Sequence, residues 1–314
     1  MRAARFHHHG DPSVLRVDDV APPRAPVGDR ILVRVLASSI NGTDLGLRAG
    51  GARIATLGRL PFVPGFDLAG EVLECGPAVT AFAPGDRIVA LLGHGGGGQA
   101  ERVLLSQSRA AAAPRSVPPE AGAALPLAGL TALQALHGKA ALHTRPGARV
   151  LVTGASGGIG SYAVQLAKLA GAHVTALASG PKLPFVTELG ADEVLDRHRH
   201  EVTDLDPTFD VVLDATGRLE LAAVRPVLAD GGILVSTRPV SLDALRALAP
   251  RRPAGRQFAA VATRARSQDL ARLVALVDAG RLRPTLDRTV PLADIVAAHR
   301  HAETDVRGKV VITL

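Results

Sequence analysis

The sequence predicts an α/β protein in which a mostly-β region comes first and a doubly wound parallel sheet follows. Three observations support this fold class. Residues 1–115 contain short β-branched runs separated by Pro, Gly and Asp, which is typical of strands joined by turns. From about residue 119, short apolar strands alternate with helical patterns, which is typical of βαβ units. A glycine-rich loop at residues 154–160 joins one of these strands to the next helix.

In the mostly-β region, turn residues bound the apolar runs and so define the expected elements. Strands are predicted at residues 30–40, 67–76 and 84–93, and the glycine run at 94–98 is expected to be a flexible connection.

Beyond residue 118 the hydrophobic period switches between helix and strand. Strands are predicted at 148–154, 172–178, 193–196, 209–217 and 233–239, and helices at 118–140, 160–171, 181–191 and 219–232. Residues 240–260 read as irregular. Helices at 267–282 and 294–304 and a terminal strand at 308–314 complete the chain.

Composition bounds the class of protein. The 314 residues suffice for about two domains. Hydrophobic residues make up 47% and charged residues 21%, so the chain can bury a core and is not expected to be disordered. No run approaches about 18 uninterrupted apolar residues, so no membrane partner is expected. Because Cys75 is the only cysteine, a disulfide framework and a cysteine-built zinc site are excluded, and a cytoplasmic location is expected.

The charge balance is basic, with 36 Lys and Arg against 29 Asp and Glu. A basic protein can bind nucleic acid, but that function needs the charges gathered on one face. Here the arginines are scattered, and one Tyr with no Trp supplies few platforms for base stacking. Nucleic acid is therefore not expected as a partner.

The glycine-rich loop carries the strongest motif. Ala155, Gly157 and Gly160 form an A-x-G-x-x-G variant of the dinucleotide-binding fingerprint, between a buried strand and a helix as that motif requires. Gly157 would let the backbone approach a pyrophosphate, and Gly160 would let the helix pack close to the strand. The helix N-terminus, with its free N–H groups, would bind the anion.

Two other motifs overlap the same loop. Gly154 to Gly158 match G-x-S-x-G, the nucleophile elbow of α/β-hydrolases, with Asp214 and His299 following Ser156 in the order that a catalytic triad requires. Residues 153–160 also match the cofactor loop of short-chain dehydrogenases. Those enzymes need a Tyr-x-x-x-Lys pair, whereas the single tyrosine, Tyr162, is followed four positions later by Leu166.

The order of motifs along the chain resembles the medium-chain dehydrogenase/reductase superfamily, specifically its zinc-free quinone oxidoreductase (zeta-crystallin-like) branch. The segments that carry this resemblance are SSINGTDLGLRAG, PFVPGFDLAGEVLECG, GDRIVALL, GLTALQAL, VLVTGASGGIGSYAVQLAKLAGA, ELGADEVLD, GGILVST and GKVVITL. It implies a GroES-like catalytic domain at 1–118, a Rossmann NADPH-binding domain at 119–255 and a return to the catalytic domain at 256–314, with the cofactor between them.

The resemblance also implies the absence of zinc. Zinc-dependent relatives place a Cys and a His-Glu pair where this chain has Asn41, Phe66 and Asp67. A phenyl ring cannot ligate a metal, so we expect no metal site. Without a Lewis acid, reduction of an already polarised acceptor is favoured over oxidation of an unactivated alcohol.

Charge indicates the choice of cofactor. No acid follows the second strand of the predicted Rossmann domain until Glu188, whereas Ser179 and Lys182 offer a hydroxyl and a cation suited to the 2′-phosphate of NADPH. Arg197 lies near the place of a family tyrosine and either pairs with this phosphate or is solvated. The expected cofactor contacts are Asn41, Thr131, Gly154, Ala155, Ser156, Gly157, Gly158, Ile159, Ser179, Lys182, Arg197, Thr216 and Gly217.

By resemblance, Asn41 and Asp44 lie beside the nicotinamide ribose and the substrate. The structural alternative for Asp44 is a helix cap. For Thr131, the alternative to cofactor contact is a hydrogen bond from its hydroxyl back to the helix backbone. The expected function is zinc-independent, NADPH-dependent reduction of a quinone or an α,β-unsaturated carbonyl. One alternative is an NADPH-binding or RNA-binding protein without turnover, and another is a serine hydrolase that uses Ser156. A homodimer is expected through the apolar strand GGILVSTRP (231–239), taken as the outer edge of the sheet.

Overall fold

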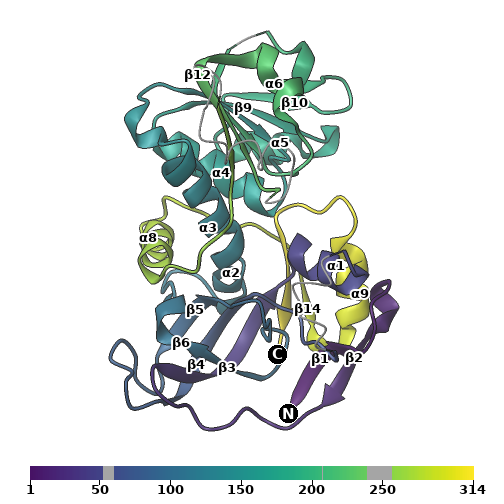
Figure 1. Ribbon diagram of the computed structural model, residues 1–314, viewed down its shortest axis with the longest axis vertical. Coiled ribbons are helices and arrows are strands. Elements are labelled where there is room, and N and C mark those ends of the chain that lie inside the picture. Colours follow the sequence, from purple (N-terminus) through teal and green to yellow (C-terminus); the bar gives the residue numbers. More distant parts are fainter. Residues whose placement is uncertain (52–59, 207, 239–256) are drawn as a thin grey trace, which may run out of the picture. The chain divides into compact units, whose positions relative to one another are not determined.

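The computed structural model describes residues 1–51, 60–206, 208–238 and 257–314 (Figure 1). The chain divides into two compact units: a first unit of residues 1–130 and 265–314, and a second unit of residues 131–264. The domain boundaries expected at 118/119 and 255/256 come earlier in the chain than the boundaries between these units. The first observed boundary falls within helix α3 (Pro126–Leu133), and the second follows strand β13 (Gln257–Ala260).

The first unit is built on a seven-stranded sheet. Its strands run in the order β14-β15-β3-β4-β5-β7, with β6 pairing the other half of β3. The long strand β3 bends across the sheet, so that residues 30–34 pair with β6 and residues 37–39 pair with β15. The strands are β3 (Arg30–Ser39), β4 (Asp67–Cys75), β5 (Arg87–Leu91), β6 (Arg102–Ser106), β7 (Ala110–Ala112), β14 (Leu286–Pro291) and β15 (Lys309–Thr313).

Beside this sheet, the N-terminal strands β1 (Arg2–Phe6) and β2 (Leu15–Asp19) form an antiparallel pair. The helices of the first unit are α1 (Gly42–Ala49), α2 (Pro119–Ala123), most of α3, α8 (Ser267–Asp278) and α9 (Ile295–Ala302). The predicted helix at 118–140 is divided. A new helix, α3, begins at Pro126, because a proline cannot donate the hydrogen bond that would continue α2. After α3, a π-helix occupies Gln134–Lys139.

Residues 94–98 were expected to be a flexible connection, and the structure corrects this. The N–H of Gly97 donates to Val63 O at 3.0 Å and that of Gly98 to Gly65 O at 2.9 Å. A Cβ at Gly98 would lie 2.8 Å from Asp67 O, and one at Gly65 would lie 2.6 Å from the Gln99 nitrogen. The glycines therefore let two backbone segments pack against each other, which fixes the start of β4.

The second unit is a parallel six-stranded sheet in the order β10-β9-β8-β11-β12-β13. In the order of the chain these strands are 3-2-1-4-5-6, the arrangement of dinucleotide-binding Rossmann folds. Helix α4 (Gly158–Leu169) packs on β8 and β9. The strands are β8 (Arg149–Thr153), β9 (His173–Ala178), β10 (Glu193–Asp196), β11 (Phe209–Asp214), β12 (Leu228–Ser236) and β13, and the other helices are α5 (Leu183–Glu188) and α6 (Leu221–Val224).

Three expectations for this unit were wrong. The helix predicted at 219–232 is limited to α6, because Pro226 interrupts the pattern and β12 already begins at Leu228. Residues 257–260, expected to be irregular, form β13 on the outer side of β12. The strand in GGILVSTRP is therefore not the edge of the sheet. Residues 239–256 lie outside the described part. None of the described helices is long and apolar enough to cross a membrane.

Candidate active site

The glycine loop after β8 is closely packed at two of its glycines. Gly154 has φ +63°, and a Cβ there would lie 2.8 Å from Thr216 Cγ2. A Cβ at Gly160 would overlap the carbonyl oxygen of Gly154 and lie 2.7 Å from Ala155 Cα. Both positions therefore require glycine, which brings α4 onto the end of β8 as the fingerprint predicts.

Gly157 differs from these two glycines. It is the N-cap of α4 with φ −80° and ψ −178°, an extended backbone that residues other than glycine also adopt. No side chain caps this end of the helix. A Cβ placed at Gly157 would lie 3.3 Å from Gly154 O, the nearest atom. Gly157, Gly158 and Ile159 are partly exposed, so their region is open to a ligand. These observations fit a pyrophosphate on the helix N-terminus.

Asp214, at the end of β11, organises the edge next to this loop. Its carboxylate accepts hydrogen bonds from the backbone N–H groups of Thr216 and Gly217 at 3.0 Å and from Thr153 Oγ1 at 3.0 Å. Ser236 at the end of β12 donates to the same carboxylate at 3.2 Å. Asp214 thus ties together three strand ends and holds Thr216 against Gly154. Sequence reasoning considered Asp214 only as a triad acid.

The loop after β9 brings together the residues expected near a 2′-phosphate. Ser179 precedes the 3₁₀ turn Gly180–Lys182, and both Ser179 and Lys182 are buried, whereas Arg197 is exposed. Sequence reasoning missed a carboxylate in this place. A Cβ at Gly180 would lie 2.8 Å from Asp196 Oδ2, so the end of β10 presents an acid beside the turn. Pairing between β9 and β10 causes this proximity.

Thr131 is buried in the second unit and its hydroxyl lies 2.7 Å from the Thr263 hydroxyl. This side-chain contact joins α3 to the segment that follows β13.

The first unit buries a polar cluster at the start of α1. Asn41 is the N-cap of this helix. Its Nδ2 donates to Asp67 Oδ2 at 2.9 Å, and its Oδ1 accepts from Lys309 Nζ. Lys309 Nζ also donates to Ile40 O at 2.8 Å and lies 3.6 Å from Asp67 Oδ2. Burial lowers the pKa of Lys309, whereas the nearby carboxylates oppose this effect. Lys309 opens the apolar final strand, and only its pairing with β3 brings it to Asn41.

Asp44 is a capping residue. One of its carboxylate oxygens accepts from the Asn41 N–H at 2.8 Å and the other from the Gly65 N–H at 2.7 Å. Its side chain is fully buried, and burial raises its pKa from 3.8 to about 6 against the effect of these two hydrogen bonds. The geometry therefore supports the capping alternative, and we assign Asp44 a positioning role rather than contact with substrate.

The positions that hold zinc ligands in relatives have other partners here. Phe66 is buried, and Asp67 accepts from Ser39 Oγ at 2.5 Å and from the Leu127 N–H at 2.7 Å as well as from Asn41. In the part of the chain that the structure describes, no three His, Cys, Asp or Glu side chains gather in a way that could hold a metal ion.

The competing motifs do not assemble active sites. His299 is buried within the first unit, where Nε2 lies 3.3 Å from Gln99 Oε1, whereas Asp214 is committed to strand ends in the second unit. His299 and Asp214 each have other partners within their own unit, which does not support a triad with Ser156. Tyr162 is fully buried in α4, which excludes the active site of short-chain dehydrogenases.

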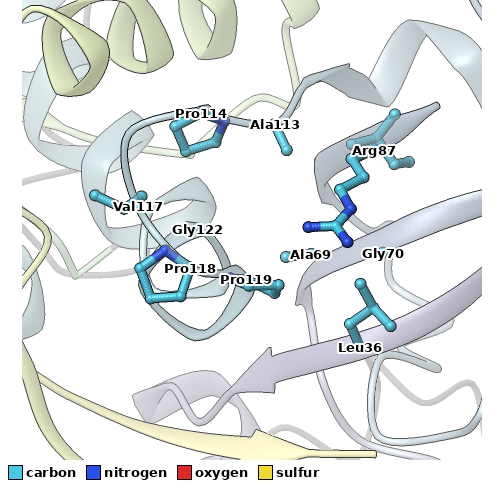
Figure 2. Close-up of a pocket in the computed structure, with 11 residues that line it drawn as sticks. Leu36, Ala69, Gly70, Arg87, Ala113, Pro114, Val117, Pro118, Pro119 and Gly122 are labelled. Carbon is cyan, nitrogen blue, oxygen red and sulfur yellow. The ribbon is translucent and has the colours of Figure 1, made fainter.

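A small pocket lies in the first unit, and Asn41 does not line it. Its volume is about 20 Å³, room for about one water molecule, so it cannot hold a quinone. Figure 2 shows Arg87 pointing into this pocket, which Pro114, Pro118 and Pro119 help to line. None of the predicted site residues borders it.

Comparisons with known proteins agree with this architecture. Residues 28–115 match the alcohol dehydrogenase GroES-like domain, and residues 189–312 match the family described as zinc-binding dehydrogenase. The chain is 33% identical to the chloroplast envelope quinone oxidoreductase homolog of Arabidopsis thaliana, over 99% of this chain and 98% of that protein. It is 29% identical to the NADPH-dependent alkenal/one oxidoreductase of the same plant, over 99% and 79%. The quinone oxidoreductase of Coxiella burnetii superposes with a TM-score of 0.89 at 29% identity, over 100% of this chain and 99% of that one.

A GroES-like unit together with a Rossmann unit and its glycine loop defines an oxidoreductase that uses a nicotinamide cofactor. The chain belongs to the medium-chain dehydrogenase/reductase family, in its quinone oxidoreductase branch. The resemblance inferred from the order of motifs is thereby confirmed.

Proposed function

We propose that this protein is an NADPH-dependent, zinc-independent reductase of quinones or α,β-unsaturated carbonyls. The observation that carries the proposal is similarity over essentially the whole chain to a quinone oxidoreductase homolog and an alkenal/one oxidoreductase. A bound nicotinamide would supply the hydride. These acceptors are already polarised by conjugation, so positioning and a proton source suffice without a Lewis acid.

In this proposal each unit has its own task. The N-terminus of α4, from Gly157 to Ile159, binds the pyrophosphate through backbone N–H groups. Ser179, Lys182 and Arg197 bind the 2′-phosphate. Within the second unit, Thr131, Thr216 and Gly217 border the cofactor. Within the first unit, Asn41 offers an amide N–H to a ligand.

The test is NADPH oxidation by the purified protein, followed by absorbance, against a panel of quinones and enones. Saturated ketones of matched size are the control, because they lack the conjugation on which the proposal depends. Turnover of the conjugated compounds alone is the expected result. Equal turnover of the saturated ketones would contradict the proposed substrate class.

An NADPH-binding or RNA-binding protein without turnover is the second candidate, favoured by the basic charge balance. It predicts that a fluorescence titration detects NADPH binding to the protein. It also predicts that no quinone or enone promotes oxidation of the bound NADPH. RNA binding, measured across a salt series, would weaken steeply as salt rises if the arginines contact phosphates.

We also propose a homodimer, paired through the outer strand of the Rossmann sheet. Among the described strands, the outermost on this side is β13 rather than β12, since β12 has β11 on one side and β13 on the other. An edge strand leaves backbone N–H and C=O groups that a twofold-related copy can pair.

A further inference from the structure

The amide of Asn41 is held between two opposite charges. Lys309 Nζ donates to its Oδ1, and its Nδ2 donates to Asp67 Oδ2 at 2.9 Å. An ammonium group can only donate and a carboxylate can only accept. The two neighbours therefore permit one orientation of the amide, because a flipped Asn41 would face a donor with a donor and an acceptor with an acceptor.

Stability alone is a poor explanation for this pair of charges. Both Lys309 and Asp67 are buried, at 3% and 0% exposure, and burying an ion pair generally contributes little more than apolar residues of similar volume would. The better attested use of a buried ion pair is to fix one geometry among several. Here the geometry that it fixes is the amide of Asn41.

Asn41 is the most exposed residue of this cluster. Its exposure is 6%, whereas Ser39, Asp44 and Asp67 are at 0%. An amide nitrogen carries two N–H groups, and Asp67 accepts one of them. Among the described residues Nδ2 donates to no second acceptor, so the other N–H can serve a ligand.

We propose that Lys309 and Asp67 are positioning residues that aim the second amide N–H of Asn41 at an oxygen of the bound ligands. This inference rests on the proposed function. The shared chemistry is an oxygen acceptor, from either the nicotinamide ribose or carboxamide of the cofactor or the conjugated carbonyl of the substrate. On a substrate carbonyl, a fixed donor would stabilise the negative charge that develops as hydride arrives.

The test is a double-mutant cycle with Asn41→Ala, Lys309→Met and the double variant. Losing one hydrogen bond to a ligand should raise the NADPH dissociation constant or lower kcat about tenfold in each single variant. Because Lys309 acts through Asn41, the double variant should be no worse than Asn41→Ala alone. Lys168→Met is the matched control, since it removes a half-buried lysine that pairs with Asp192 at 2.7 Å outside the cluster.

Two measurements separate the sources of the oxygen. A rise in the NADPH dissociation constant, measured without acceptor, assigns the N–H to the cofactor. An unchanged NADPH dissociation constant with a lower kcat for the quinone assigns it to the substrate. Losses that multiply in the double variant, or single variants with wild-type constants, would overturn the inference.

Two further experiments cover the cases in which a variant fails to fold or the proposed function fails. If Lys309→Met fails to fold, Asp67→Asn perturbs the other end of the amide and predicts the same lack of additivity with Asn41→Ala. If the wild-type protein reduces no acceptor, the proposed function fails by itself. The cycle on NADPH dissociation constants then decides the inference, and unchanged constants would overturn it.

Discussion

Asp67 lies where zinc-dependent relatives have a zinc ligand, and here its carboxylate binds neighbouring residues of the protein instead. Its carboxylate accepts hydrogen bonds from Ser39, Asn41 and the Leu127 backbone, so its oxygens already have partners. Phe66 beside it offers only a ring. Asp67 thus serves geometry within the protein, which supports the proposed zinc-independent reaction.

Removing metals should therefore leave activity intact. We expect NADPH oxidation to be unchanged after prolonged dialysis against a strong chelator, and elemental analysis to find no stoichiometric zinc. Activity that collapses under the chelator and returns with added zinc would contradict the zinc-independent mechanism.

Lys182→Ala should weaken NADPH binding about tenfold to a hundredfold, because a charge-assisted hydrogen bond to the 2′-phosphate is lost. NADH lacks that phosphate, so its affinity should change little. Asp196→Asn should act in the opposite direction, since it removes a carboxylate from the same turn. Fluorescence titration with both cofactors measures these effects. Equal losses for NADPH and NADH in Lys182→Ala would remove the assignment.

Stability should fall in acid because of His299. Burial, aided by the charge of Arg48, lowers the pKa of His299 from 6.5 to about 3. The folded ring stays neutral while the unfolded chain takes up a proton, so its contribution is full above pH 6.5 and is lost as the pH falls toward 3. The raised pKa of Asp44 acts in the opposite sense between pH 3.8 and about 6.

Thermal melts across this range test the effect. Relative to the wild type, His299→Gln should show a shallower fall in Tm between pH 6.5 and pH 4. His8→Gln, at an exposed position, is the control and should leave the slope unchanged. Parallel curves for the wild type and His299→Gln would contradict the assigned cause.

Among the elements, those with a local cause were the ones that could be predicted. The strand–loop–helix of β8 and α4 follows from glycines whose absence of a Cβ is required on the spot. The end of α6 was missed although Pro226 signals it, and β13 was missed because QFAA is a short pattern that partner strands define. Pairing decided these elements more than propensity did.

The two inner glycines of the loop should respond differently to substitution. Gly160→Ala places a Cβ on the Gly154 carbonyl and should lower stability by about 1–3 kcal/mol. Gly157→Val keeps an allowed backbone angle and has one close contact, 3.3 Å from its Cβ to Gly154 O, so it should lower Tm less than Gly160→Ala does. Its side chain projects toward the anion, so NADPH binding should be lost. Melts of the apo-protein and NADPH titrations measure the two effects. NADPH binding at wild-type affinity in Gly157→Val would show that the pyrophosphate lies elsewhere.

For the whole molecule, the class of fold and the family were predictable, because the motifs occur in a fixed order along the chain. The clustering of Asn41 with Lys309 was not, since 268 residues separate them and only the pairing of β15 with β3 brings them together. The same limit applies to Asp196, which reaches the Ser179–Lys182 turn through the pairing of β10 with β9. Sequence reasoning thus found groups within one loop and missed groups shared between strands.

The proposed homodimer is a property of the whole molecule and can be measured directly. Sedimentation velocity at micromolar concentration should give the mass of two chains, because β13 offers an edge for twofold pairing. A single species with the mass of one chain would contradict the proposal.

The position of β15 between β14 and β3 has a consequence for biosynthesis. A ribosome delivers residues 131–264 in one uninterrupted stretch, so the second unit can fold while translation continues. The first unit cannot be finished then, because β14 and β15, which complete one side of its sheet, are still untranslated. Until Lys309–Thr313 emerge, residues 37–39 of β3 lack the partner to which they pair, and this nascent edge is where a chaperone would be needed.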